Sequence, residues 1–164
     1  MSHAKQEEVL SLLGRGGFSP PVRGSGGTSY DPLLDPEGAE RLCELLSESL
    51  VSHGPTSLIV WDGVVDGVLG FVLARRLSLP LVRLVEEEGL LTIHGNLPSA
   101  ARAVLVIDVV RAQVEIVAAE GALRSNGSEL VAVAALVDPG LHADIEVDAL
   151  LHITPPDTTP AGPV

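Results

Sequence analysis

Residues 104–115 read VLVIDVVRAQVE: a β-branched apolar run that ends in Asp108, then a turn, then a helical pattern. A strand, a short loop and a helix in this order form many phosphate-binding sites, where glycine lets backbone N–H groups close around the phosphate and threonine adds hydroxyl donors. In this chain the turn contains Arg111, Ala112 and Gln113. The stretch therefore predicts the framework of such a site without the residues that usually bind the phosphate.

The composition indicates one globular domain with an aliphatic core. The chain has 164 residues, of which 46% are hydrophobic and only 2% are aromatic. This length is enough to bury a sizeable core without covalent cross-links. The single cysteine, Cys43, excludes an internal disulfide and a cysteine-based metal site, and we expect it to pack in the core as a small apolar residue.

The charge is strongly negative. The formal net charge is -12, Lys5 is the only lysine, and no lysine or arginine follows Arg124. Such a field repels nucleic acid, anionic membranes and polyphosphates. The apolar runs are too short to cross a bilayer and the first residues show no secretory pattern. We therefore expect a cytoplasmic protein with no nucleic-acid and no membrane partner.

Apolar periodicity divides the chain into alternating helices and strands. Helices are predicted over residues 6–13, 36–52, 64–77 and 113–125, and strands over residues 57–61, 79–85, 103–108 and 130–136, with 90–93 as a hairpin partner. This alternation predicts an α/β fold with a mostly parallel sheet flanked by helices. One domain is expected over residues 1–154, followed by a Pro-rich disordered tail over residues 155–164.

The order of these elements resembles the type I phosphoribosyltransferases, and among them the orotate phosphoribosyltransferases. The likeness covers residues 6–154 and rests on GSGGTSY at 24–30, DPE at 35–37, HGNLP at 94–98 and the strand that ends at Asp108. The resemblance implies a mostly parallel sheet flanked by helices, a small hood from the N-terminal segment and, usually, a homodimer. It also implies a phosphoribosyl diphosphate donor that is bound with magnesium and transfers its ribose phosphate to a base nitrogen.

The sequence departs from the pattern of that family at the anion-binding positions. Of the two neighbouring acids that would hold the ribose hydroxyls, Ile107 replaces the first and Asp108 keeps the second. The diphosphate loop corresponds to residues 60–68 and carries Asp62 and Asp66, where an anion would sit. The expected basic pair falls on Val85 and Glu86, and the mobile catalytic loop is reduced to residues 87–91.

These departures argue against turnover. Removing one preorganised donor for developing charge costs about 10²–10³ in rate, and here a whole set is missing. We expect no catalytic residue and no metal site, and residual ligand binding, if any, at Asp108, Arg111, Ala112 and Gln113. No cofactor is expected, and magnesium only where some donor binding remains.

Several single residues keep two interpretations. Asp108 is either a surviving ligand-facing group or a cap at the entry of the next helix, and the two are equally open. Arg111 could meet an anion, but we favour an ion pair with Glu115 one helical turn later. We expect a structural or solvated role for His94, and a core or dimer-interface position for Trp61.

The leading hypothesis is a non-catalytic relative of orotate phosphoribosyltransferase that serves as a binding, regulatory or assembly subunit, as a homodimer or as a hetero-oligomer with a related chain. The alternative is an active transferase that makes orotidine monophosphate, or a related product, with residues supplied by a partner.

Overall fold

The computed structural model describes residues 3–20, 29–140 and 146–153. Within them the chain forms, in order, α1 (His3–Arg15), α2 (Pro36–Leu50), the short 3-10 helix η1 (Val51–His53), β1 (Ser57–Trp61), α3 (Val64–Leu77), β2 (Leu81–Glu87), β3 (Leu90–His94), β4 (Arg102–Val109), α4 (Gln113–Ser125), β5 (Glu129–Asp138) and β6 (Val147–His152). Residues 21–28, which include most of the GSGGTSY motif, and the tail predicted for 155–164 lie outside the described residues.

The strands form one sheet in the order β3-β2-β1-β4-β5-β6. All neighbouring pairs are parallel except β2 and β3, which form an antiparallel hairpin. Its two-residue turn consists of Glu88 and Gly89, whose φ angles of 53° and 80° fit the left-handed turn that such a tight hairpin requires. The predicted α/β fold with a mostly parallel sheet is confirmed.

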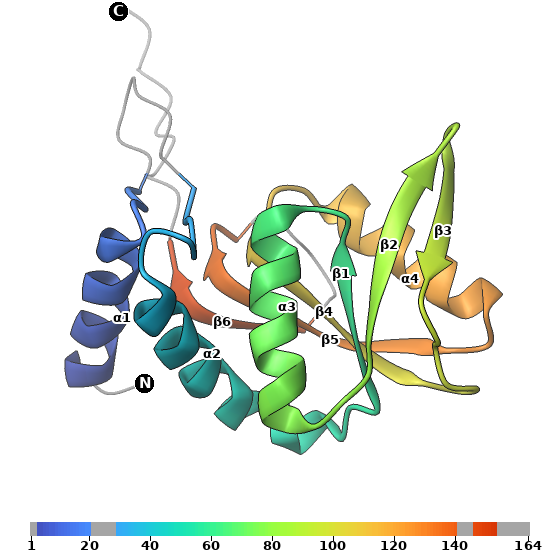
Figure 1. Cartoon of the computed structure of the whole chain (residues 1–164), viewed down its shortest axis with the longest axis horizontal. Helices are drawn as coiled ribbons and strands as arrows, with labels where there is room; N and C mark the ends of the chain where they lie inside the picture. The colour runs from blue at the N-terminus through green and yellow to red at the C-terminus, as the bar shows by residue number, and fades with distance from the viewer. Residues whose placement is uncertain (1–2, 21–28, 141–145, 154–164) are drawn as a thin grey trace, which may run out of the picture.

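Helices cover both faces of the sheet, three on one face and one on the other (Figure 1). Alternating residues of β4 point to the two faces. Val104 and Val106 join the core under α1, α2 and α3, whereas Leu105 and Ile107 join the core under α4. The central strand is buried on both sides, which explains its nearly continuous apolar sequence.

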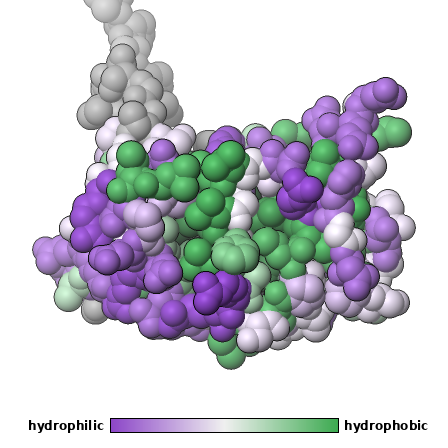
Figure 2. Space-filling model, in the orientation of Figure 1, coloured by the Kyte–Doolittle hydropathy of each residue, from purple (hydrophilic) through white to green (hydrophobic). Residues whose placement is uncertain are grey.

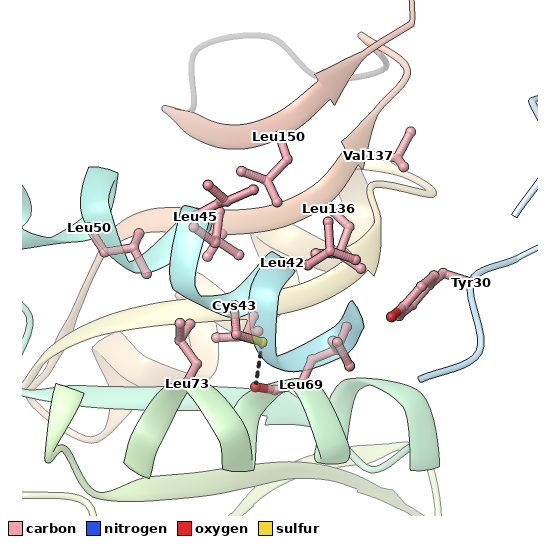
Figure 3. Close-up of a cluster of buried hydrophobic side chains, with 14 of the residues drawn as sticks. Tyr30, Leu42, Cys43, Leu45, Leu50, Leu69, Leu73, Leu136, Val137 and Leu150 are labelled. Carbon is pink, nitrogen blue, oxygen red and sulfur yellow. Dashed lines mark hydrogen bonds between the residues drawn. The ribbon is translucent and has the colours of Figure 1, made fainter. Parts of the chain in front are cut away.

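The larger core lies between α2, α3 and the sheet (Figure 3). Leucines from α2, α3, β5 and β6 meet there, and Cys43 is buried among them. The Cys43 thiol donates a hydrogen bond to the carbonyl oxygen of Leu69, with 3.6 Å between the heavy atoms. Burial raises the pKa of this thiol to about 12, and the predicted core position of Cys43 is confirmed.

The DPE motif at the start of α2 forms the predicted helix entry. The Asp35 side chain accepts a hydrogen bond from the Gly38 amide at 3.1 Å, and Pro36 is the first helical residue. Arg15 at the end of α1 lies 2.6 Å from the Asp35 carboxylate. The N-terminal segment, which the family resemblance implies to be a hood, thus packs beside α2 at the β6 side of the sheet.

Helix and strand positions agree closely with the sequence-based expectations. Helices α3 and α4 and strand β1 begin and end at the predicted residues, and β2 and β5 are displaced or extended by two residues at most. Strand β6 was not predicted as a strand, and it pairs in parallel with the end of β5. Among the described residues no helix is both long and apolar enough to span a membrane.

Candidate functional site

Three aspartates lie at the edge of the sheet where its parallel strands end. Asp62 follows β1, Asp108 is the penultimate residue of β4, and Asp138 is the last residue of β5. Open α/β sheets bind ligands outside the carboxyl ends of their strands. This edge is therefore the candidate site, and it contains all four residues selected from the sequence: Asp108, Arg111, Ala112 and Gln113.

Asp108 is fully buried and forms an ion pair with the loop that follows it. Its Oδ1 atom lies 2.6 Å from Nη2 of Arg111, and the Asp108 side chain is 0% exposed. Its Oδ2 atom is buried and has no hydrogen-bond partner among the described residues. Burial raises the pKa of Asp108, and the positive charge of Arg111 acts in the opposite direction.

The predicted ion pair between Arg111 and Glu115 is wrong. Helix α4 begins at Gln113, so Arg111 lies in the preceding loop and not one helical turn before Glu115. The loop instead directs the guanidinium back to Asp108. The interpretation of Asp108 as a helix cap is also wrong, because Ala112 occupies the cap position without a side-chain hydrogen bond.

Asp66 joins the site from the first turn of α3. It is 4% exposed, and its Oδ1 accepts a hydrogen bond from the backbone N–H of Asp108 at 3.0 Å. Burial, and after it the negative charge of Asp108, raises the pKa of Asp66 to about 6. The sequence identifies Asp66 only as an acid in the region that corresponds to the diphosphate loop. The one local signal is its place in the first turn of a helix, where the helix dipole favours an acid.

The loop between β4 and α4 does not form an anion nest. Phosphate nests use successive backbone N–H groups in alternating right- and left-handed conformations. None of the residues 109–113 has a positive φ, and Ala112 is fully extended with φ -156° and ψ 144°. The side chains of Arg111, Gln113 and Val114 are exposed at this helix start.

The loop after β1 is occupied by a second ion pair. Asp62 lies 2.6 Å from Nη1 of Arg83 on β2, and Gly63 precedes α3 in extended conformation. Trp61 is partly exposed and packs against the core under α4, which agrees with the first of its two predicted positions, core or dimer interface. Within the part of the chain that the structure describes, Arg83 and Arg111 are the arginines at this edge, and carboxylates engage both.

Two further contacts between polar side chains are present among the described residues, one at the end of β5 and one on the β2–β3 hairpin. Asp138 is buried, and its carboxylate accepts a hydrogen bond from Gly140 N at 2.7 Å and lies 3.1 Å from Nδ1 of His152. His94 is exposed and lies 3.6 Å from the Glu87 carboxylate, as expected of a structural or solvated histidine. Within the described parts of the chain no group of three or more His, Cys, Asp or Glu side chains could hold a metal ion.

Comparison with known proteins shows that the chain is similar to phosphoribosyltransferases in sequence and in fold. No family model matches the chain. The orotate phosphoribosyltransferase of Brucella ovis is 28% identical over 109 residues, which are 65% of this chain and 57% of that relative. The chain therefore matches little more than half the length of this curated relative.

Solved structures show the same fold. A phosphoribosyltransferase from Corynebacterium diphtheriae superposes with a TM-score of 0.73 at 18% identity, covering 91% of this chain and 96% of that one. The orotate phosphoribosyltransferase from Aeropyrum pernix superposes with a TM-score of 0.70 at 21% identity, covering 88% of this chain and 93% of the other.

Proposed function

We propose that this chain, which has the type I phosphoribosyltransferase fold and is similar in sequence to orotate phosphoribosyltransferases, is a non-catalytic relative of those enzymes. It would act as a binding, regulatory or assembly subunit. The observation that carries the proposal is the contact between Arg111 and Asp108 at the end of β4. Arg111, the loop residue that could attract a phosphate, is paired with Asp108, the acid that could hold a ribose hydroxyl.

The electrostatics of the edge support this proposal. Two unit charges ~5 Å apart interact by roughly 3 kcal/mol at an effective dielectric constant of ~20. A diphosphate at this edge would face Asp62, Asp66 and Asp108, while Arg83 and Arg111 are already paired. Each acid that stands where an anion site needs a cation therefore weakens binding by a similar amount before screening.

The residues at the edge do not fit a magnesium ion. Hard cations require several oxygen ligands. Asp108 Oδ1 is paired with Arg111, Asp66 Oδ1 accepts a backbone hydrogen bond, and no cluster of three carboxylate or imidazole groups exists in the described residues. No cofactor is proposed, and magnesium would enter only together with a bound donor.

Isothermal titration with phosphoribosyl diphosphate and magnesium chloride tests the proposal. We expect no heat of binding at micromolar to millimolar donor, whereas an active orotate phosphoribosyltransferase in the same buffer serves as the positive control. Micromolar binding by this chain would contradict the proposal.

A second candidate is an active transferase whose missing cations come from a partner. The retained Asp108 at the carboxyl end of β4 favours it, since this is the position from which a ribose hydroxyl could be held. Steady formation of orotidine monophosphate from orotate and the donor, abolished by Asp108→Asn, would establish this activity. The absence of product with the chain alone and with co-purified partners would eliminate it.

The assembly role predicts a homodimer or a hetero-oligomer with a related chain in the cytoplasm. In one form of the hetero-oligomer, this chain supports an active paralogue. Affinity purification of the chain at its natural level, followed by identification of what elutes with it, separates the two. A related transferase in stoichiometric amount indicates the hetero-oligomer, and the chain alone indicates the homodimer.

A further inference from the structure

A hollow with a volume of about 350 Å³ lies between α1, α2 and β6. These three elements pack against one another at the β6 side of the sheet (Figure 1). The hollow is lined by Lys5 of α1, by three residues of α2 and by residues 148–150 of β6. Its size falls at the lower end of the range of ~300–1,000 Å³ that small-molecule sites occupy. The lining residues named here are not part of the edge at Asp108, so the hollow is separate from the candidate site.

The floor of the hollow is aliphatic. Leu45 of α2 and Leu150 of β6 both line it, each is 4% exposed, and the two side chains lie next to each other (Figure 3). Figure 2 shows mostly hydrophilic surface over α1 and the adjacent part of α2, whereas apolar surface gathers over α3. The leucine floor, formed by Leu45 and Leu150, is therefore a local apolar feature on a polar side of the molecule. An aliphatic group placed on it would be removed from water.

Charges of both signs surround this floor. Lys5 Nζ lies 2.7 Å from Oε2 of Glu48, and both residues line the hollow. Asp148 also lines it, and its Oδ2 lies 2.6 Å from Nε2 of His53. The Ser49 hydroxyl donates to a backbone carbonyl of its own helix at 2.9 Å, so its oxygen can accept a hydrogen bond from a ligand. The hollow thus presents a cation, two carboxylates and a hydroxyl around an apolar floor.

This combination selects a ligand by its charges. Glu48 and Asp148 repel a polyanion such as diphosphate, and Lys5 repels a simple cation. An uncharged apolar molecule would cover these charged groups without pairing with them, which costs their hydration. A small molecule that carries one ammonium group, one carboxylate and an aliphatic side chain matches all three features. Because its net charge is zero, the net charge of -12 on the chain does not repel it.

We propose that this hollow binds a free α-amino acid with an aliphatic side chain, such as leucine. The ammonium group of the ligand donates to the Asp148 carboxylate and to Ser49 Oγ, its carboxylate pairs with Lys5, and its side chain lies on the leucine floor. A carboxylate has about four acceptor positions, so Asp148 keeps its contact with His53 while it binds the ligand. The proposal does not depend on the loss of turnover, because the hollow and the Asp108 edge are probed with different ligands.

Titration of the ¹⁵N-labelled chain with L-leucine, followed by NMR, tests the site and its location. We expect saturable shifts of the amide signals of residues 48–49 and 148–150, with a Kd on the order of 0.1–1 mM for a ligand of this size. Three analogues each lack one recognised group: 4-methylpentanoate lacks the ammonium group, 3-methylbutylamine lacks the carboxylate, and glycine lacks the side chain. Each should bind about tenfold more weakly or less, because one set of contacts is lost.

A matched pair of variants identifies the acid that holds the ammonium group. Asp148→Asn should weaken leucine binding about tenfold or more, while its amide oxygen can still accept a hydrogen bond from His53. Glu120→Gln removes an acid of α4 that pairs with Arg124 and should leave binding unchanged. No saturable shift up to about 20 mM leucine, equal affinity for leucine and its analogues, shifts confined to the Asp108 edge, or unchanged binding by Asp148→Asn would each overturn the proposal.

Discussion

The carboxyl group of Asp66 keeps its proton to a higher pH than an exposed aspartate does, because it is buried beside Asp108. Its pKa is raised from 3.8 to about 6 in the folded chain, so the unfolded chain releases this proton first. The contribution of the group to stability is therefore complete below pH 3.8 and is lost as the pH rises through 6. Because of this raised pKa, the Asp66 carboxyl group makes the protein less stable at neutral pH than in mild acid.

Asp66→Asn should remove that loss. The amide oxygen can still accept the hydrogen bond from the Asp108 N–H, while the charge is gone. The variant should match the unmodified chain near pH 4 and exceed it by up to ~3 kcal/mol in free energy of unfolding at pH 7.5. Urea denaturation at four pH values between 4 and 7.5 measures this difference. A constant difference across the range would show that the pKa of Asp66 is not raised.

Arg111→Ala should destabilise the chain because it leaves the Asp108 carboxylate buried without its cation. We expect a loss of about 1–3 kcal/mol near neutral pH and a smaller loss at pH 4, because burial raises the pKa of Asp108 and protonation removes the unpaired charge. Urea denaturation at both pH values provides the measurement. Arg124→Ala, which removes an exposed pair with Glu120 on α4, is the matched control and should cost no more than ~0.5 kcal/mol. Equal effects of the two variants would mean that the pair at Asp108 is solvated.

At the level of elements, Gly70 allows α3 to approach β1. A Cβ atom at this position would lie 2.4 Å from Cγ1 of Val60, which is fixed in the core. Gly70→Ala should therefore cost about 1–3 kcal/mol in stability despite the better helix propensity of alanine. In α4, a Cβ at Gly121 would meet nothing within 4 Å, so Gly121→Ala should stabilise by roughly 0.5–1 kcal/mol. Thermal unfolding of the two variants should show shifts of opposite sign.

The sequence predicts the elements that carry their own signals. Helix α3 begins after Gly63, and helix α4 ends at Ser125, directly before Asn126 and Gly127, as the sequence pattern predicts. The sequence does not predict strand β6, because this strand depends on pairing with another strand. Val137 of β5 lies opposite Leu151 of β6 in the sheet. A segment of six residues of mixed polarity does not predict a strand when the partner strand is unknown.

The sequence predicts where the candidate site lies, but it does not predict which residues contact each other there. Asp108 and the residues after it lie at the expected edge, since the end of a buried strand is visible in the sequence. The contact between Asp66 and Asp108 joins residues 42 positions apart and depends on how α3 packs on β4. The partner of Arg111 depends on the residue at which α4 begins, and a shift of that start by two residues would have favoured Glu115.

At the scale of the whole molecule, the excess of acidic residues acts on folding itself. The chain has 22 acidic and 10 basic residues, so the folded state concentrates like charges that the unfolded state spreads apart. Sodium chloride at a few hundred millimolar should stabilise the fold at pH 8 by about 1 kcal/mol, or roughly 2–4 °C in Tm. The gain should vanish near pH 4.6, the isoelectric point of the sequence. Calorimetry at both pH values checks this, and a decrease in Tm at pH 8 would show that the surface ion pairs outweigh the repulsion.

Strand β4 lies at the centre of the sheet, is hydrogen-bonded on both sides and contributes to both cores. Its amide protons can reach water only when the domain as a whole opens, and this includes the N–H of Asp108, which donates to Asp66. The β2–β3 turn, in contrast, exchanges through local fluctuations. A ligand bound at the edge would therefore slow amide exchange by the same factor along the whole of β4. This factor of slowing would report the free energy of binding directly.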